Sequence, residues 1–314
     1  MQHLKELGSF LPGSRIGIML VHGLAGTPTE MKFVAKRLNK YGFSVLCPLL
    51  AGHCSSEADL VATNWKDWTT SVENAYERMA EHMDVVFVGG LSAGAVLSLY
   101  LAQCKPKGVR GLCLYSTTLC WDGWSIPKLS FLLPLVLRLP YIGKRYRFEE
   151  VYPYGIMNEK LRSRIYSQMQ SGDSSTAGHA ATPGTSLREL WRLVDIVKKG
   201  LPKVFTPTFI VHARNDDIAS LRNNAAYVKQ HIGGPAELLL LENSYHMITV
   251  DQERNTVCDA TAVYFHNLLS EAEKTELARH AQAAIFETMS EPAAENDESY
   301  PGRSESIVCQ ATSA

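Results

Sequence analysis

The chain of 314 residues is long enough for one large domain or two modest ones, and 46% of its residues are hydrophobic. Its 31 Lys and Arg nearly balance its 32 Asp and Glu, which argues against a nucleic-acid-binding protein that neutralises phosphates. No apolar run reaches the roughly 18–20 residues of a membrane span, and residues 1–14 lack the layout of a signal peptide. The seven cysteines are scattered without a CxxC pair, which favours reduced thiols in a cytoplasmic protein over disulfides or a zinc site.

Short apolar runs alternate with helical stretches from Arg15 onward, a pattern typical of a mostly parallel α/β sheet flanked by helices. One helix should follow the capping box Thr27-Pro28-Thr29-Glu30 and stop near Gly42, and another should start after Asn64. Further helices are expected at 93–103, 219–230 and 250–269. Strands are expected at 16–21, 44–49, 85–88, 111–115, 208–212 and 237–241.

The strand and helix alternation breaks between residues 116 and 204, where prolines separate short helical pieces. We therefore expect residues 1–115 and 205–269 to form one core, with 116–204 inserted between its halves as a helical cap or lid. Residues 270–289 predict one further helix. Residues 290–314 are polar and acidic, which is typical of a disordered tail.

The strongest chemical signal is the sequence Gly90-Leu91-Ser92-Ala93-Gly94, between a predicted strand and a predicted helix. This is the context of a nucleophile elbow, a tight turn that lifts a serine hydroxyl above the sheet. The flanking glycines keep the turn free of clashes. Ser92 is therefore the candidate nucleophile.

A serine hydroxyl needs a positioned base, and ten histidines are available. His246 stands out because it lies between the last predicted strand and the last core helix, at the sheet edge where the elbow also lies. His22 and His53 also follow predicted strands and are alternatives.

The base in turn needs an acid that fixes its tautomer. Asp216 and Asp217 follow the strand expected at 208–212, and either gives the chain order Ser92, Asp, His246 that nucleophile-elbow hydrolases show. Asp195, in a predicted helix of the insertion, is a weaker alternative.

An oxyanion hole requires two backbone N–H donors. One is expected from Ala93, directly after the nucleophile, and the other from Leu24, in the Gly-rich turn after the first long strand. The same turn lacks the glycine spacing of nucleotide-binding loops, and no clustered His and Cys ligand set for a metal occurs.

The most apolar stretch of the chain is 129–139, within the insertion. It emerges after the strand expected at 111–115, at the same sheet edge as Ser92. We expect this stretch to line an acyl pocket, with Phe131 and Leu135 as candidate pocket residues.

Together these segments resemble the α/β-hydrolase fold, and within it the carboxylesterase and monoacylglycerol lipase-like group with a small helical cap. The likeness covers about residues 17 to 269 and is weakest across the insertion. Cys54 departs from it, since the group usually has Gly there, and the insertion is longer than the group's short caps. The segments that carry the likeness are the oxyanion loop 20–26, the turn 50–54, the helix start 64–68, the elbow 90–94, the acid loop 212–218 and the histidine loop 244–253.

This resemblance favours Asp216 over Asp217 as the catalytic acid. It implies hydrolysis of carboxylic esters through an acyl-enzyme, without a cofactor or metal. The expected substrate is a small acyl ester of short or medium chain, including monoacylglycerols. Amide or peptide hydrolysis, acyl or thioester transfer, and a non-catalytic ligand sensor on the same fold remain alternatives.

Overall fold

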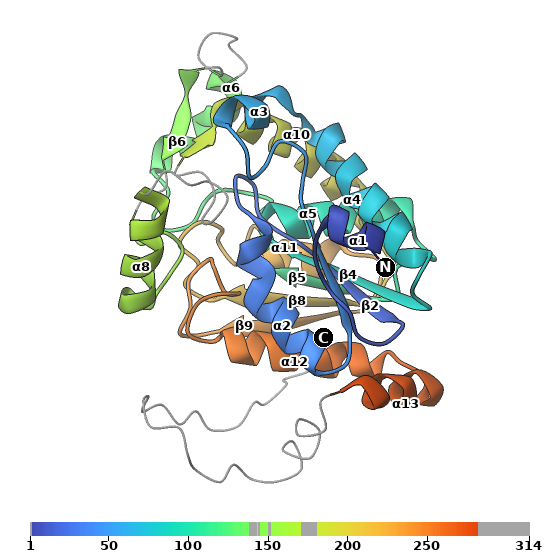
Figure 1. Ribbon diagram of the computed structural model, residues 1–314. Helices are drawn as coiled ribbons and strands as arrows, with labels where there is room; N and C mark the ends of the chain where they lie inside the picture. The colour runs from blue at the N-terminus through green and yellow to red at the C-terminus, as the bar shows by residue number, and fades with distance from the viewer. Residues whose placement is uncertain (1, 138–142, 144, 150–151, 171–180, 282–314) are drawn as a thin grey trace.

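The computed structural model describes residues 2–137, 143, 145–149, 152–170 and 181–281 (Figure 1). The tail expected at 290–314 and the second part of the helix expected at 270–289 lie outside these residues. Within the described residues, no helix is both long and apolar enough to cross a lipid bilayer.

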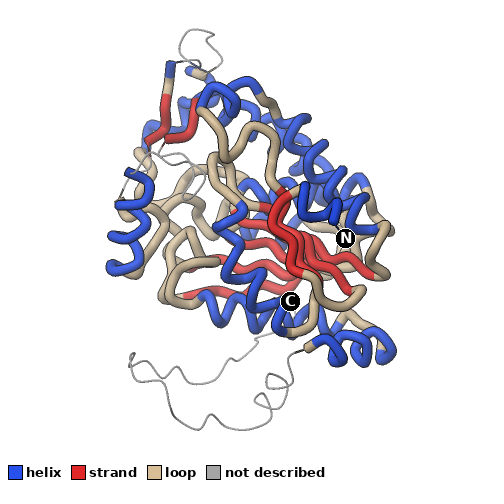
Figure 2. The backbone as a smooth tube through the Cα atoms, viewed as in Figure 1, coloured by secondary structure: helices blue, strands red, loops and turns tan. Residues whose placement is uncertain are grey.

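A seven-stranded sheet forms the centre of the molecule (Figure 2). All neighbouring strands run parallel except the first, which pairs antiparallel with β3 at one edge. This is the mostly parallel sheet that the sequence predicts. The spatial order is β1 (Gly8–Leu11), β3 (Ser44–Pro48), β2 (Ile16–Val21), β4 (Val85–Leu91), β5 (Leu112–Tyr115), β8 (Thr208–Ala213) and β9 (Ala236–Leu241).

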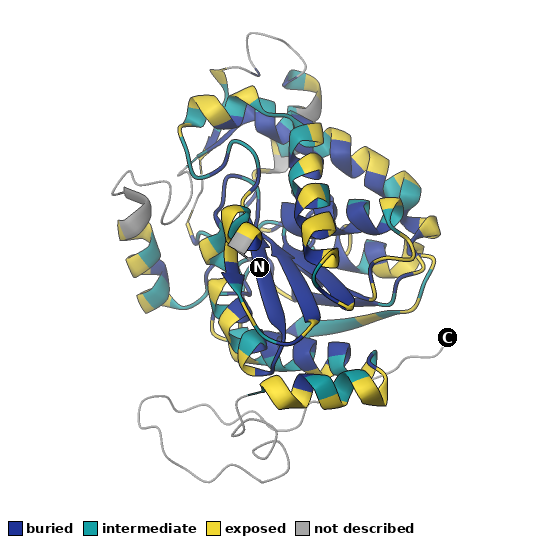
Figure 3. Cartoon of the chain, turned by 45° about the vertical axis from the view of Figure 1, so that its right-hand side comes forward, coloured by how far each residue is buried: buried dark blue, intermediate teal, exposed yellow. Residues whose placement is uncertain are grey.

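Helices cover both faces of this sheet, and the inner strands are therefore buried throughout (Figure 3). Successive strand residues enter opposite cores, as Val88 and Phe87 of β4 do. The first core is closed by α1 (Gln2–Glu6), α4 (Trp65–Ala80), α5 (Ala93–Cys104), α10 (Gly184–Gly200) and α11 (Ala225–His231). The second core is closed by α2 (Lys32–Lys40), α12 (Arg254–Asn267) and α13 (Glu271–His280).

The region 116–204 contains more than the helical pieces that its prolines suggest. Two short strands form a separate antiparallel pair, and α10 packs against α4 and α5. The end of the insertion thus joins the same helix layer as the core. Its other elements are η2 (Lys128–Leu132), α6 (Leu133–Val136), β6 (Arg147–Glu149), α8 (Glu159–Gln170) and β7 (Ala181–Pro183).

The start of α11 differs from the sequence prediction. The helix begins at Ala225 rather than at 219, because the side-chain oxygen of Asn224 accepts the backbone N–H groups of Leu119 and Cys120, both at 2.7 Å. This tertiary contact holds Asn224 outside helical geometry, with φ −123° and ψ −92°.

The start of α12 also differs, at Arg254 rather than at 250. Here the Asp251 carboxylate accepts N–H groups from two other segments, those of Met157 at 2.7 Å and Asn158 at 3.1 Å and that of Tyr245 at 3.1 Å. The chain before Arg254 therefore forms turns around a carboxylate.

The remaining short elements are η1 (Pro28–Met31), α3 (Glu57–Ala62) and η3 (Leu201–Lys203).

Candidate active site

Ser92 lies at the sharp turn between β4 and α5, with φ 57° and ψ −114°. Few residues other than glycine adopt such a conformation, so the turn stores strain. A Cβ atom on Gly90 would collide with the backbone of Gly94, and one on Gly94 would collide with the carbonyl oxygens of Val21 and His22. The turn therefore requires both glycines of the predicted elbow.

The hydroxyl of Ser92 is hydrogen-bonded to the hydroxyl of Thr118 at 3.0 Å. Thr118 donates its own proton to the Ser116 carbonyl at 3.1 Å, so Ser92 is the donor in the shared bond. Sequence reasoning missed Thr118. Its signal was its place just after β5, whose carboxyl end lies beside that of β4.

The ring of His246 is held by Asp216. Nδ1 lies 3.0 Å from Oδ1 and 2.9 Å from Oδ2, which leaves Nε2 as the basic nitrogen. Burial alone would raise the pKa of Asp216, but the charge and hydrogen bond of His246, together with His212, outweigh it and keep that pKa below its ordinary value. Asp216 is therefore a carboxylate that can stabilise an imidazolium.

Asp217 makes different contacts from its neighbour. Oδ1 accepts the backbone N–H of His246 at 3.2 Å, and Oδ2 accepts that of Gly155, in the insertion, at 3.0 Å. Burial raises the pKa of Asp217. This residue contacts main chain on both sides of the pocket, whereas Asp216 contacts the ring.

The alternative histidines hold the loops around the site. Nε2 of His22 accepts the Leu50 N–H at 3.3 Å, and Nε2 of His53 accepts the Ala25 N–H at 3.2 Å. Burial, and the nearby charge of His53, lower the pKa of His22 to about 3. Asp195 is exposed on α10 and does not line the pocket that holds Ser92.

The backbone N–H groups of the loop after β2 differ in whether they have an acceptor. The N–H of Gly23 donates to Glu30 Oε2 at 2.9 Å, and that of Ala25 donates to His53. Between them, the N–H of Leu24 donates to no acceptor within the described part of the chain. Leu24 is the residue expected to supply an oxyanion donor.

The N–H of Ala93 is similarly available. As the first residue of α5 it has no partner within the helix, and none among the other described residues. Ala93 directly follows Ser92, as the predicted oxyanion hole requires.

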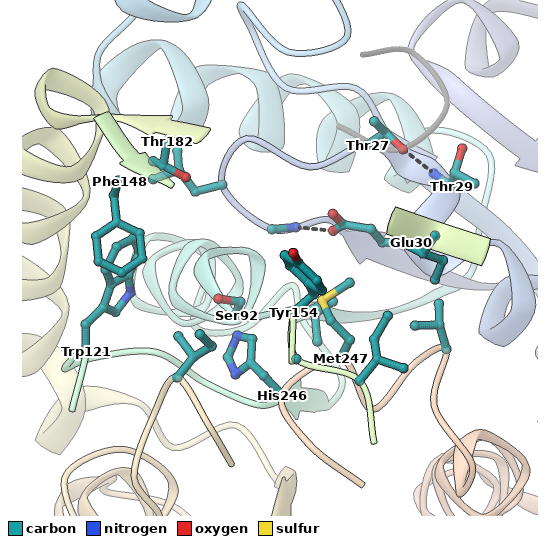
Figure 4. Close-up of a pocket in the computed structure, with 18 of the residues that line it drawn as sticks. Thr27, Thr29, Glu30, Ser92, Trp121, Phe148, Tyr154, Thr182, His246 and Met247 are labelled. Atoms are coloured by element: carbon teal, nitrogen blue, oxygen red, sulfur yellow. Dashed lines mark hydrogen bonds between the residues drawn. The ribbon is translucent and has the colours of Figure 1, made fainter. Parts of the chain in front are cut away.

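Ser92 and His246 line one pocket of about 200 Å³ (Figure 4). In Figure 4, Trp121 and Phe148 lie on one side of Ser92, and Glu30 with its threonine neighbours lies on the other. The lining residues are Gly23, Leu24, Thr27, Thr29, Glu30, Leu91, Ser92, Trp121, Phe148, Tyr154, Gly155, Ile156, Ile165, Thr182, Leu190, Ile218, His246, Met247 and Val250.

The predicted pocket residues of the insertion need correction. Leu135 is 66% exposed and does not line the pocket, because α6 turns it toward solvent. The backbone of Phe131 belongs to η2, but its side chain lies outside the described part of the structure. The insertion still contributes apolar side chains to the lining of this pocket, but they are those of Trp121 and Phe148.

No group of three or more His, Cys, Asp and Glu side chains in the described ranges is arranged to hold a metal ion. The chemistry that these residues support is acyl transfer to a serine, with His246 as base and Asp216 as its partner.

The chain is similar in sequence to a family of known proteins. Residues 14–253 match the family described as serine aminopeptidase, S33. The chain is 29% identical over 251 residues to a thermostable monoacylglycerol lipase of Bacillus sp. (strain H-257), covering 80% of this chain and 90% of that protein. It is 24% identical over 247 residues to a carboxylesterase of Bacillus subtilis (strain 168), covering 78% and 90% respectively.

Among solved structures, one described for LipS and LipT, two metagenome-derived lipolytic enzymes, matches with a TM-score of 0.71 and 25% identity. The match covers 82% of this chain and 96% of that one.

Proposed function

Because this chain belongs to the serine aminopeptidase S33 family of α/β hydrolases, we propose that it is a serine esterase that forms an acyl-enzyme on Ser92. Its proposed substrates are carboxylic esters of short to medium acyl chains, monoacylglycerols included. The observation that carries the proposal is the double contact of His246 Nδ1 with Asp216, in the pocket that Ser92 also lines. The names of the relatives support an ester substrate.

Acylation would begin when Nε2 of His246 takes the proton of Ser92 as its oxygen attacks the ester carbonyl. The hydroxyl first leaves its bond to Thr118. Hydrogen bonds from the N–H groups of Leu24 and Ala93 would stabilise the negative charge that develops on the carbonyl oxygen. Each such donor is worth about 3 to 4 kcal/mol of barrier.

Breakdown of the first tetrahedral intermediate expels the alcohol, which receives the proton from His246. Water then attacks the acyl-enzyme with His246 again acting as base. The second tetrahedral intermediate breaks its bond to the Ser92 oxygen, which takes the proton back from His246 as the carboxylic acid leaves. Asp216 stays ionised through both steps and stabilises the imidazolium, a role that its lowered pKa supports.

The decisive experiment compares wild type with Ser92→Ala on a panel of acyl esters of graded length, with matched amides and thioesters. Wild type should hydrolyse the esters, and Ser92→Ala should lose on the order of 10⁴-fold or more because the triad acts as a unit. A serine-directed phosphonate should label Ser92 in wild type alone. Unchanged turnover in Ser92→Ala, or labelling at another residue, would overturn the proposal.

A second candidate is hydrolysis of aminoacyl amides, and one observation favours it. Glu30 places a carboxyl group in the pocket, where it could face a substrate α-amino group. Aminoacyl 4-nitroanilides, added to the same panel, test this candidate. Turnover of these amides above that of the esters would make the amide activity the principal one.

A further inference from the structure

Glu30 lies on η1 with its carboxyl group inside the turn formed by the loop after β2. Oε2 accepts the N–H of Gly23 at 2.9 Å, and the nearby backbone N–H of Thr27 also lowers the pKa of the carboxyl group. The contact with Gly23 spans seven residues to the far end of the loop, and the side chain of Thr27 caps η1 by accepting the Thr29 N–H. One side chain thus closes the whole turn that contains Leu24.

The loop is shaped to receive this side chain. A Cβ atom on Gly26 would collide with the Glu30 carboxyl group, so any other residue there would displace that group from its present position. A Cβ on Gly23 would lie 3.3 Å from Oε2, which is also tight. The glycines at both ends of the turn therefore pack directly against the carboxyl oxygens, and the position of the turn depends on them.

The two backbone N–H groups that flank Leu24 have different acceptors. The N–H of Gly23 points at Glu30, and that of Ala25 points at His53. The intervening N–H of Leu24 is left without an acceptor among the described residues. Fixing the two flanking groups fixes the direction of the one between them.

We propose that Glu30 is a positioning residue of the reaction, whose carboxyl group holds the turn from Gly23 to Thr27 so that the Leu24 N–H faces the oxyanion. This inference rests on the proposed serine esterase function. It assigns to Glu30 an effect on the transition state rather than on substrate binding.

The charge of Glu30 separates this role from simple helix capping. Burial raises the pKa of Glu30 to about 7, although the N–H groups of Gly23 and Thr27 and the ring of His246 act in the opposite direction. The titratable groups near it are His246, Tyr154 in the same pocket, and Cys54. No Lys or Arg occurs among the described residues that line the pocket. With a pKa of about 7, the carboxyl group changes charge within the pH range of an ordinary esterase assay.

The test compares wild type, Glu30→Gln, Glu30→Ala and a control, Asp59→Asn. Asp59 accepts the N–H of Ser56 at 3.1 Å in the exposed capping box of α3, and it does not line the pocket. The control therefore removes the charge of a carboxyl group that accepts a backbone N–H near a helix start, away from the site. For each variant, kcat and KM for a short-chain 4-nitrophenyl ester are measured from pH 5.5 to 9. Two further measurements are made on each variant. One is the inhibition constant of an alkyl trifluoromethyl ketone, which forms a tetrahedral adduct on serine, and the other is the melting temperature.

Glu30→Ala should lower kcat about 10- to 100-fold, less than outright loss of an oxyanion donor, with KM changed by no more than about twofold. Its inhibition constant for the ketone should rise by a similar factor. Glu30→Gln keeps an oxygen that can accept the Gly23 N–H, so it should keep kcat within about fivefold of wild type. It should also remove a pH dependence near 7 that Asp59→Asn retains.

Unchanged kcat and ketone inhibition in a folded Glu30→Ala would overturn the inference and leave Glu30 a helix cap. A rise in KM alone would instead assign it to substrate binding. Absence of ester turnover in wild type would overturn the proposed function. The rate of Ser92 labelling by the phosphonate would then still test Glu30, because phosphonylation draws on the same N–H donors.

Discussion

Asp217 holds the main chain of His246 and not its ring, since its Oδ1 accepts the backbone N–H at 3.2 Å. The adjacent Asp216 holds the ring through Nδ1. Two neighbouring carboxylates of similar burial thus perform separate tasks on one histidine, one positioning the loop and the other fixing the tautomer.

This division predicts unequal effects of two matched substitutions. Asp216→Asn should lower kcat about 10³- to 10⁴-fold, because the amide favours the wrong tautomer of His246. Asp217→Asn can accept only one of the two N–H groups that the carboxylate accepts. It should destabilise the fold by about 1–3 kcal/mol and reduce kcat far less. Ester kinetics and urea unfolding of both variants check this, and equal losses of kcat would transfer the acid role in part to Asp217.

The pocket wall predicts the dependence on acyl length. Phe148 lines the pocket, and each methylene that a substrate buries there is worth about 0.8 kcal/mol. Phe148→Ala should therefore flatten the rise of kcat/KM with chain length while acetyl ester turnover persists.

Leu135→Ala is the matched control, because Leu135 is an exposed apolar residue of the same insertion. Its profile over a series of 4-nitrophenyl esters should coincide with that of wild type. A shifted profile in Leu135→Ala, with none in Phe148→Ala, would contradict the pocket described here.

The strained backbone at Ser92 predicts that glycine at this position gives a more stable protein than alanine does. Glycine adopts φ 57° and ψ −114° more readily than any residue with a Cβ atom. Ser92→Gly should therefore have a free energy of unfolding about 1 kcal/mol above that of Ser92→Ala, in which the strain remains. Denaturant unfolding of the two inactive variants measures the difference, and a less stable glycine variant would contradict it.

Glu30 predicts a pH dependence of stability with a defined sign. Its pKa rises from 4.5 to about 7 on folding, so between these values the folded state binds more protons than the unfolded state. Stability from this group is present at low pH and declines as pH rises toward 7, by up to about 3 kcal/mol. The free energy of unfolding of Glu30→Gln, measured from pH 4.5 to 8, should lack this decline. Parallel curves for wild type and variant would show that Glu30 has an ordinary pKa.

The sequence was informative where structure depends on neighbours along the chain. The elbow around Ser92 and the strands at 16–21 and 208–212 follow from local patterns of glycine and apolar residues, and the structure contains these elements. Choosing Asp216 over Asp217 required the resemblance to a family. Both residues follow the same strand, and only the fold shows which carboxylate meets the ring.

What the sequence left open depends on contacts between distant segments. Glu30 is recognisable as a capping residue, but its bond to Gly23 depends on how the loop after β2 folds back. An apolar stretch does not reveal which side will be buried, and Leu135 lies on the exposed side of α6. The helix predicted from 219 starts only at Ala225, because the side chain of Asn224 binds backbone more than a hundred residues away.

The carboxylates of Asp217 and Asp251 connect the insertion to the loop that carries His246. Gly155 donates its N–H to Asp217 and accepts that of Met247 at 2.8 Å, while Met157 donates to Asp251. A movement of segment 155–157 away from the pocket breaks the bonds of Gly155 to Asp217 and Met247, which directly follow Asp216 and His246 in the chain. The position of this segment and the orientation of His246 are thus mechanically coupled, so that replacing the insertion without these bonds would shift His246 as well as change the pocket wall.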